Sequence, residues 1–235
     1  MRNSLKNTLL NTFLAIPILL GAKTERVCAV TSDWGKSPLP QVLKEPNPEF
    51  KEAKLWLEQL GKRQREAKSF LLRFEAEGFD AEGEKLTSFK GSLLSGDSGR
   101  FRLEYSKNLI VCDGKTLWQY FSQTRQLILR NAQDAKDSKT AGGILLRYLH
   151  AQPLQAKRVP QGLQIMLDAK SSGENLDSLT LLLDDKNHSV IQVETVDPTG
   201  TRLIYIVKTL KLEAKVRPKD FEAPKPSGAE IVDMR

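Results

Sequence analysis

The sequence is poor in the residues from which soft-metal sites and histidine-based catalytic centres are built. Its 235 residues include only 2 Cys and 2 His. A zinc site needs three or four such ligands, and general acid–base catalysis most often uses histidine. Glycine (15 residues) and proline (11 residues) are too few for a collagen-like or low-complexity chain. The composition therefore favours a globular protein without chemistry based on His or Cys.

Two candidate nucleophiles remain, and neither has a convincing partner. Gly96-Asp97-Ser98-Gly99 resembles the nucleophile loop of chymotrypsin-like proteases, but both histidines, His150 and His188, follow Ser98, whereas in those enzymes the histidine comes first. The loop is better interpreted as a turn, and His188 is expected in a solvated turn. Cys112, which would need His150 as its base, lies in an apolar strand rather than an exposed electropositive setting. With no nucleotide-binding or metalloprotease motif, we predict no metal and no cofactor. A hydrolase that uses Ser98 or paired carboxylates such as Asp184-Asp185 ranks as the last alternative.

The N-terminus has the layout of a secretory signal peptide. Residues 1–6 carry positive charge without acids, and an apolar run follows over residues 9–22. A transmembrane helix needs about 20 apolar residues, and Pro17 would kink this shorter run, so an uncleaved anchor is the lesser alternative. Cleavage after Ala29 or after Ala22 fits the small residues there. We predict that residues 1–29 are a removed signal peptide.

Removal of this segment changes the charge and the cysteine chemistry. The formal net charge of +7 falls to +4 after cleavage at Ala29, because residues 1–29 hold four basic residues and one acidic residue. That surplus is not the clustered charge that nucleic-acid binding needs, so no nucleic-acid partner is expected. Cleavage at Ala29 leaves Cys112 alone. Cleavage at Ala22 keeps Cys28, and a Cys28–Cys112 disulfide could then form in an oxidising compartment.

The mature chain divides into a leader and one domain. Residues 30–48 are rich in proline and are predicted to be an extended leader, and a single domain is predicted over 49–235. Asn47-Pro48-Glu49 is a typical helix start, and apolar residues at helical spacing predict a helix over about 48–67. Residues 131–150 break the strand pattern and predict one or two short helices. Two-residue alternation predicts strands at about 70–78, 84–95, 100–105, 109–112, 116–121, 126–130, 155–160, 162–168, 177–184, 189–196, 201–213 and 229–232.

This pattern predicts a mainly β fold with a few helices. About eleven antiparallel strands in meander order favour one open half-barrel, lidded by short helices over an apolar cavity. Asp113-Gly114 is the strongest hairpin signal within it. A fully packed core remains the alternative to a cavity.

Four segments, at residues 109–120, 99–105, 196–200 and 220–229, together resemble the LolA family of periplasmic outer-membrane lipoprotein carriers. Residues 109–120 resemble its Asp-Gly-Lys-Thr-Leu-Trp hairpin with the preceding strand and the following Tyr. Residues 99–105 are similar to its Phe strand, residues 196–200 to its Asp-x-x-Gly turn, and residues 220–229 to its Phe-to-Gly ending. The likeness extends over about 49–233.

This resemblance implies a carrier without enzymatic activity. Its expected cargo is acylated lipoproteins, taken from an inner-membrane ABC-type lipoprotein release complex and handed to an outer-membrane receptor by a periplasmic monomer. The alternative is a module of the same fold that binds glycolipid or senses envelope stress. At the position of the family's lid-latching arginine the chain has Asp97, with Arg100 three residues on, so these two are the latch candidates. Leu103 stands where the family has a strand tryptophan.

The expected lipid-binding residues are apolar residues of the alternating strands and of the predicted lid. The strand candidates are Phe70, Leu72, Phe74, Phe89, Leu93, Phe101, Leu103, Tyr105 and Trp118. The lid candidates are Ile144, Leu145 and Leu149.

Overall fold

The structure, a computed structural model, describes residues 47–133, 148, 151–172 and 175–235. The predicted signal peptide, residues 30–46 of the predicted leader and the three lid candidates Ile144, Leu145 and Leu149 lie outside the described residues.

Helix α1 spans Pro48–Glu66 and agrees with the predicted helix. It begins where Asn47 accepts a hydrogen bond from the backbone N–H of Phe50 (2.8 Å), with proline at the first helical position. It ends at Ala67, whose backbone is extended. Within the described residues, no helix has the length and apolar character to cross a membrane.

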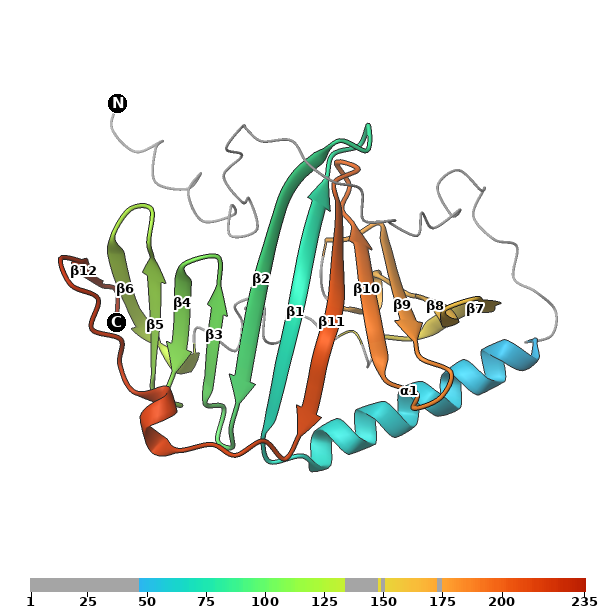
Figure 1. Cartoon of the computed structure of the whole chain (residues 1–235), viewed down its shortest axis with the longest axis horizontal. Coiled ribbons are helices and arrows are strands. Elements are labelled where there is room, and N and C mark those ends of the chain that lie inside the picture. Colours follow the sequence, from blue (N-terminus) through green and yellow to red (C-terminus); the bar gives the residue numbers. More distant parts are fainter. Residues whose placement is uncertain (1–46, 134–147, 149–150, 173–174) are drawn as a thin grey trace. The chain divides into compact units, whose positions relative to one another are not determined.

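Within the described residues, twelve strands form a single open sheet (Figure 1). The strands are β1 (Phe70–Phe79), β2 (Lys85–Ser95), β3 (Phe101–Tyr105), β4 (Asn108–Cys112), β5 (Thr116–Phe121), β6 (Gln126–Asn131), β7 (Pro153–Val159), β8 (Gly162–Leu167), β9 (Ser178–Leu183), β10 (Val190–Val196), β11 (Arg202–Leu212) and β12 (Glu230–Asp233). Their order is β12-β6-β5-β4-β3-β2-β1-β11-β10-β9-β8-β7. The sheet thus consists of two meanders, β1–β6 and β7–β11, joined by the antiparallel pairing of β1 with β11. The open half-barrel predicted from the alternation is confirmed.

The last strand departs from the prediction, since it runs parallel to its neighbour. After β11 the chain passes through the short 3-10 helix η3 (Pro218–Phe221) and returns to the far edge of the sheet (Figure 1). There Glu230 pairs with Gln126 and Asp233 with Leu129, so β12 runs in the direction of β6. A long connection of this kind permits parallel pairing, which a short hairpin cannot provide.

The turns between strands follow local side-chain chemistry. Asp113 accepts hydrogen bonds from the backbone N–H groups of Lys115 and Thr116 (both 2.7 Å), which confirms the predicted Asp113-Gly114 hairpin between β4 and β5. Gly114 has a φ of 95°, a conformation that favours glycine. The Gly96–Gly99 segment is likewise a turn, between β2 and β3, and not part of a helix or strand.

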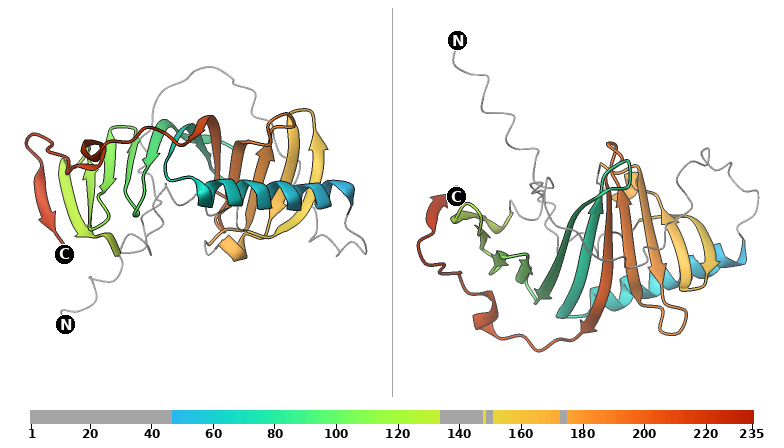
Figure 2. Two further views of the ribbon diagram at one scale, coloured as in Figure 1. Left: turned by 90° about the horizontal axis from the view of Figure 1, so that it is seen from below. Right: turned by 45° about the horizontal axis from the view of Figure 1, so that its top comes forward.

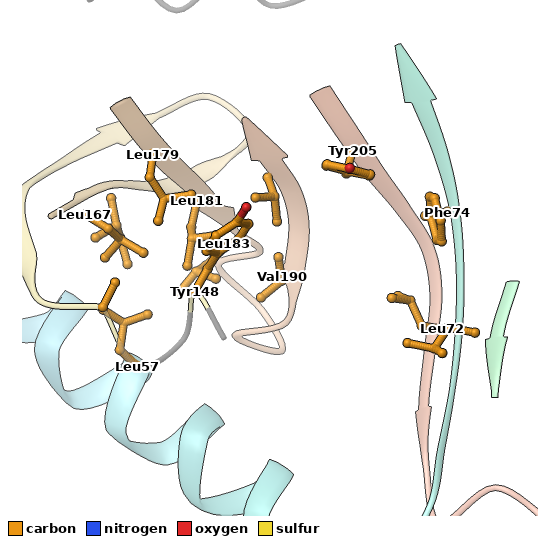
Figure 3. Close-up of a cluster of buried hydrophobic side chains, with 14 of the residues drawn as sticks. Leu57, Leu72, Phe74, Tyr148, Leu167, Leu179, Leu181, Leu183, Val190 and Tyr205 are labelled. Carbon is orange, nitrogen blue, oxygen red and sulfur yellow. The ribbon is translucent and has the colours of Figure 1, made fainter. Parts of the chain in front are cut away.

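Helix α1 lies across the wing formed by β7–β11 and makes its main contacts with β7 and β8 (Figure 2). Leu57 is 5% exposed and points toward Leu167 and Leu183 of the sheet, which are 1% and 0% exposed (Figure 3). Helix and wing therefore share one hydrophobic core.

A ring stacking, a cation–π contact and two ion pairs also hold α1 to the strands. The ring of Trp56 stacks on His188 with 3.7 Å between ring centroids, and the Arg158 guanidinium lies 5.4 Å from the same ring. Arg158 pairs with Glu52 of α1 (2.6 Å) and with Asp185 of the β9–β10 turn. His188 lies in the loop between β9 and β10 as expected, but Trp56 covers one face of its ring, so the side chain is partly buried rather than fully solvated.

The docking of α1 can be tested with two leucines of the same helix. Leu57→Ala removes a buried side chain and should lower the free energy of unfolding by about 2–5 kcal/mol. Leu55 is 58% exposed, so Leu55→Ala should change it by less than about 0.5 kcal/mol. Urea denaturation followed by circular dichroism measures both, and equal losses would contradict the described docking.

Candidate functional site: the inner face of strands β1–β6

The candidate site is the face of β1–β6 that is continuous with the helix-covered face of β7–β11. Directly paired residues project to the same side of a sheet, so the register identifies which residues share this inner face. One line of paired residues crosses the sheet from β11 to β6 and is called here the inner row. It consists of Leu210, Leu72, Leu93, Leu103, Ile110, Gln119 and Ile128.

The inner row is an apolar strip apart from Gln119. Leu72, Leu93 and Leu103 are 2%, 1% and 0% exposed. Helix α1 has its main contacts on β7 and β8, at the other wing of the sheet. The strip belongs to the same cluster of buried residues as Trp56 and Leu57 of the helix, although it lies on other strands than those the helix mainly contacts.

Aromatic rings form a second line beside the inner row. The ring of Phe74 lies 5.7 Å from that of Tyr205 and 6.4 Å from that of Phe89, and Phe89 lies 5.9 Å from Tyr105. Burial raises the pKa of the Tyr105 hydroxyl, so this group stays neutral at neutral pH. The line spans β11, β1, β2 and β3 and presents a neutral, largely apolar surface.

The position of the Phe74 ring depends on a glycine. A Cβ atom placed on Gly91, the residue paired with Phe74 on β2, would lie 2.3 Å from Cζ of the ring. The absence of a side chain at Gly91 therefore leaves the space that the tip of the Phe74 ring occupies.

Eight of the strand candidates predicted from the sequence share the inner face. They are Phe70, Leu72, Phe74, Phe89, Leu93, Phe101, Leu103 and Tyr105. Alternation missed the inner-face positions on β4 and β5, among them Ile110, Cys112 and Leu117. The sequence does contain a signal for these positions. The turn at Ser106-Lys107 has two residues, and this length sets which residues of β4 share the face of Leu103.

Trp118 is a correction to the predicted set. It pairs with Val111 and Leu129 on the opposite face of the sheet, while its neighbour Leu117 pairs with Cys112 on the inner face. The four residues between Cys112 and Leu117 set this register. A side chain on the outer face cannot line the same surface as Leu103.

The latch candidates Asp97 and Arg100 lie together in the β2–β3 turn. Their side chains form an ion pair, and the Arg100 guanidinium lies 5.2 Å from the ring of Phe221 in η3. A Cβ atom on Gly96 would come within 3.0 Å of that ring. Among the described residues, these contacts join the turn to the C-terminal segment rather than to a lid.

Cys112 offers no reactive centre. The side chain is 2% exposed, and burial raises the pKa of its thiol. Its proposed partners, Cys28 and His150, lie outside the described residues. Within the residues that the structure describes, no three His, Cys, Asp or Glu side chains gather as a metal site.

A shallow groove of about 590 Å³ lies where β3 ends beside the longer β2, and Phe74, Gly91 and Tyr105 of the inner face contribute to its lining. Its charged lining is paired internally, since Glu75 contacts Lys90 (2.9 Å) and Lys208 (3.0 Å). Hydrogen bonds from these two lysines lower the pKa of Glu75. Charged pairs and apolar side chains of the inner face thus line this groove together.

Comparisons with known proteins agree with this architecture. The sequence profile of the LolA family, described as outer membrane lipoprotein carrier protein LolA, matches residues 65–224. No curated protein sequence matches the chain closely enough to count as a relative. An uncharacterized conserved protein from Thermus thermophilus is similar in structure, with a TM-score of 0.50, 14% identity, and coverage of 77% of this chain and 99% of that one.

Two further solved structures were compared. A LolA superfamily protein from Nitrosomonas europaea has a TM-score of 0.38 and 13% identity, covering 73% of this chain and 97% of its own. The lipoprotein LppX from Mycobacterium tuberculosis has a TM-score of 0.40 and 10% identity, covering 71% and 98%. The Thermus structure and the family profile support the half-barrel fold.

The fit between Phe74 and Gly91 yields a test of the inner face. Gly91→Ala should lower the free energy of unfolding by about 1–3 kcal/mol, because the new methyl group must displace the Phe74 ring. Ser88→Ala changes an exposed position of the same strand and should have little effect. Thermal unfolding of both variants distinguishes them, and an unchanged stability of Gly91→Ala would contradict the described ring position.

Proposed function

Because the chain belongs to the LolA family of outer membrane lipoprotein carrier proteins, we propose that it carries acylated lipoproteins across the periplasm. The acyl chains would lie on the inner face of β1–β6, and the protein would transfer them from the inner to the outer membrane. No covalent chemistry is needed for this activity.

The observation that carries the proposal is the inner face of β1–β6, whose inner row is apolar apart from Gln119 and whose rings of Phe89, Phe101 and Tyr105 are partly exposed. Burial of one CH₂ group is worth about 0.8 kcal/mol, so three chains of about 16 carbons would cost on the order of 38 kcal/mol in water. A carrier must replace the bilayer with an apolar surface of similar extent. The inner row and the aromatic line beside it supply such a surface across neighbouring strands.

The binding residues proposed from the structure are those of the inner face. Phe89, Phe101 and Tyr105 are partly exposed there and are the side chains best placed to touch a ligand, next to the buried Leu93 and Leu103. The lid candidates Ile144, Leu145 and Leu149 stay a prediction.

The direction of cargo transfer would come from differences in affinity for the cargo between successive partners rather than from a chemical reaction. We propose that an inner-membrane ABC-type release complex loads the protein and that an outer-membrane receptor with higher affinity removes the cargo. The protein would act as a monomer in the periplasm, delivered by the predicted signal peptide at residues 1–29. Asp97 and Arg100 would hold the C-terminal segment in place during loading.

The test is extraction of cargo from a membrane. Inner-membrane vesicles that contain a triacylated lipoprotein and its ATP-driven release complex are incubated with the purified mature protein. The soluble fraction should then contain a one-to-one complex of lipoprotein and carrier. Failure to extract any lipoprotein would refute the proposal, and recovery of glycolipid from periplasmic protein by mass spectrometry would favour the alternative of a glycolipid-binding module.

Two variants on one strand locate the binding face. Phe89→Gln places a polar group on the inner face and should lower cargo affinity about tenfold, because about 1.5 kcal/mol of apolar contact is lost. Leu94→Gln makes a similar change on the outer face of β2 and should leave affinity unchanged. Circular dichroism controls for folding, and equal binding by the two variants would place the cargo elsewhere.

A further inference from the structure

Basic side chains are concentrated where helix α1 and strands β1 and β11 meet. The end of α1, the start of β1 and the end of β11 lie together at one end of the strands, where the chain continues toward η3 (Figure 1). The backbone N–H of Lys68 donates a hydrogen bond to the Glu213 carboxylate (3.1 Å), so the segment between α1 and β1 lies against the end of β11. Residues 62–68 and 211–220 are called here the basic corner.

The basic corner carries the whole net positive charge of residues 30–235. Its two segments contain eight Lys and Arg residues against three Asp and Glu residues. This surplus of five exceeds the formal net charge of +4 that remains after cleavage at Ala29, so the rest of the mature chain is close to neutral. All eight basic residues are exposed. They are Lys62, Arg63, Arg65, Lys68, Lys211, Lys215, Arg217 and Lys219.

Six of these eight basic side chains have no carboxylate partner. Lys62 pairs with Glu66 (3.9 Å) and Arg217 with Asp220 (3.0 Å), and within the described part of the chain the other six form no ion pair. An anionic partner can therefore contact these six side chains without breaking an ion pair first.

The acidic side chains of neighbouring turns do not offset this charge. The β2–β3 and β9–β10 turns lie at the same end of the strands as the basic corner. In these turns Asp97 pairs with Arg100, and Asp185 pairs with Arg158. The positive potential of the basic corner is thus available to a partner of opposite charge.

The distribution of the six unpaired side chains fits an extended anionic surface better than a small anion. They come from the last turn of α1, the segment before β1, the end of β11 and the chain up to η3, and none of them lines the groove beside β3. A small ligand is bound by groups that converge on a cavity, whereas basic residues spread over an exposed surface attract the headgroups of an anionic bilayer. Leu71, which pairs with Lys211, and Val216 are partly exposed among them and add apolar contact.

We propose that the basic corner docks the protein on the phosphate headgroups of an anionic phospholipid bilayer. The six unpaired Lys and Arg side chains contact the headgroups. This inference does not depend on the proposed carrier function, because the surface lies outside the inner face and needs no cargo. It gives the protein an affinity of its own for a membrane.

Sedimentation with vesicles tests the proposal. The mature protein without cargo is mixed with vesicles of phosphatidylcholine, either pure or containing about 30% phosphatidylglycerol. It should bind the anionic vesicles at about 0.05 M NaCl and be released at about 0.5 M NaCl, because salt screens exposed charges. Failure to bind the anionic vesicles, or equal binding to the neutral ones, would overturn the proposal.

A triple variant locates the docking surface. Arg65→Gln, Lys211→Gln and Lys215→Gln together remove three charges from the basic corner. Each basic residue near an anionic surface contributes a factor of about five, so the triple variant should bind the anionic vesicles about a hundredfold more weakly.

The matched control removes three charges at the opposite end of the strands. Lys107 of the β3–β4 turn, Arg125 of the β5–β6 turn and Lys170 of the connection before β9 are exposed there. Changing these three residues to Gln gives the same net charge and should weaken binding by less than about threefold. Circular dichroism controls for folding, and equal weakening by the two triple variants would overturn the role of the basic corner.

Two further outcomes separate the partner and the carrier function. Tighter binding to soluble polyglutamate than to the anionic vesicles would overturn the bilayer as the partner and favour an acidic protein. Loss of vesicle binding with lipoprotein extraction intact would overturn this inference alone. Vesicle binding without lipoprotein extraction would support this inference and contradict the carrier function.

Discussion

The structure depends on the pairing of β1 with β11. These strands are distant in the sequence, yet they join the two meanders into one sheet. At one end of the pair the Ser69 hydroxyl donates a hydrogen bond to the carbonyl of Ala214 (2.7 Å), and the backbone N–H of Glu213 donates to the carbonyl of Ser69 (2.8 Å). Closing so long a loop costs conformational entropy that local contacts do not repay. Without this pairing each meander would have one more exposed edge, and the inner row could not continue from β1 to β11.

The two wings of this sheet use their shared inner face differently. On β7–β9 the face carries aliphatic residues such as Leu167 and Leu183 against α1, in the manner of an ordinary hydrophobic core. On β1–β6 the inner face lies away from the main contacts of the helix. Its residues include a glycine, large aromatic rings and one carboxamide. A dense core tolerates such a mixture poorly, because an unpaired amide in it would only cost stability. Phe89, Phe101 and Tyr105 are the partly exposed members of this face, and they are the side chains that the proposed ligand would contact.

The sequence predicted the elements well and the faces only in part. Alternation located the strands, and Leu72, Leu93 and Leu103 were assigned to one surface before their pairing was known. Trp118 falls on the outer face because alternation within one strand does not tell which of its two faces is the inner one. The turn lengths between β3, β4 and β5 set the register, and Leu117 takes the inner position for that reason. Gln119 was overlooked because a polar residue in a strand is normally expected to face water.

Local chemistry therefore accounts for the helix that starts at Asn47, for the Asp113-Gly114 hairpin and for the two-residue period of the strands, since each depends on neighbours within a few residues. The parallel direction of β12, the ring of Phe74 over Gly91 and the unpaired oxygen of Gln119 depend on residues that are far away in the chain. They follow from strand pairing and from the course of the C-terminal segment after η3. Such features depend on the free energy of the whole sheet, and a local sequence pattern does not determine that free energy.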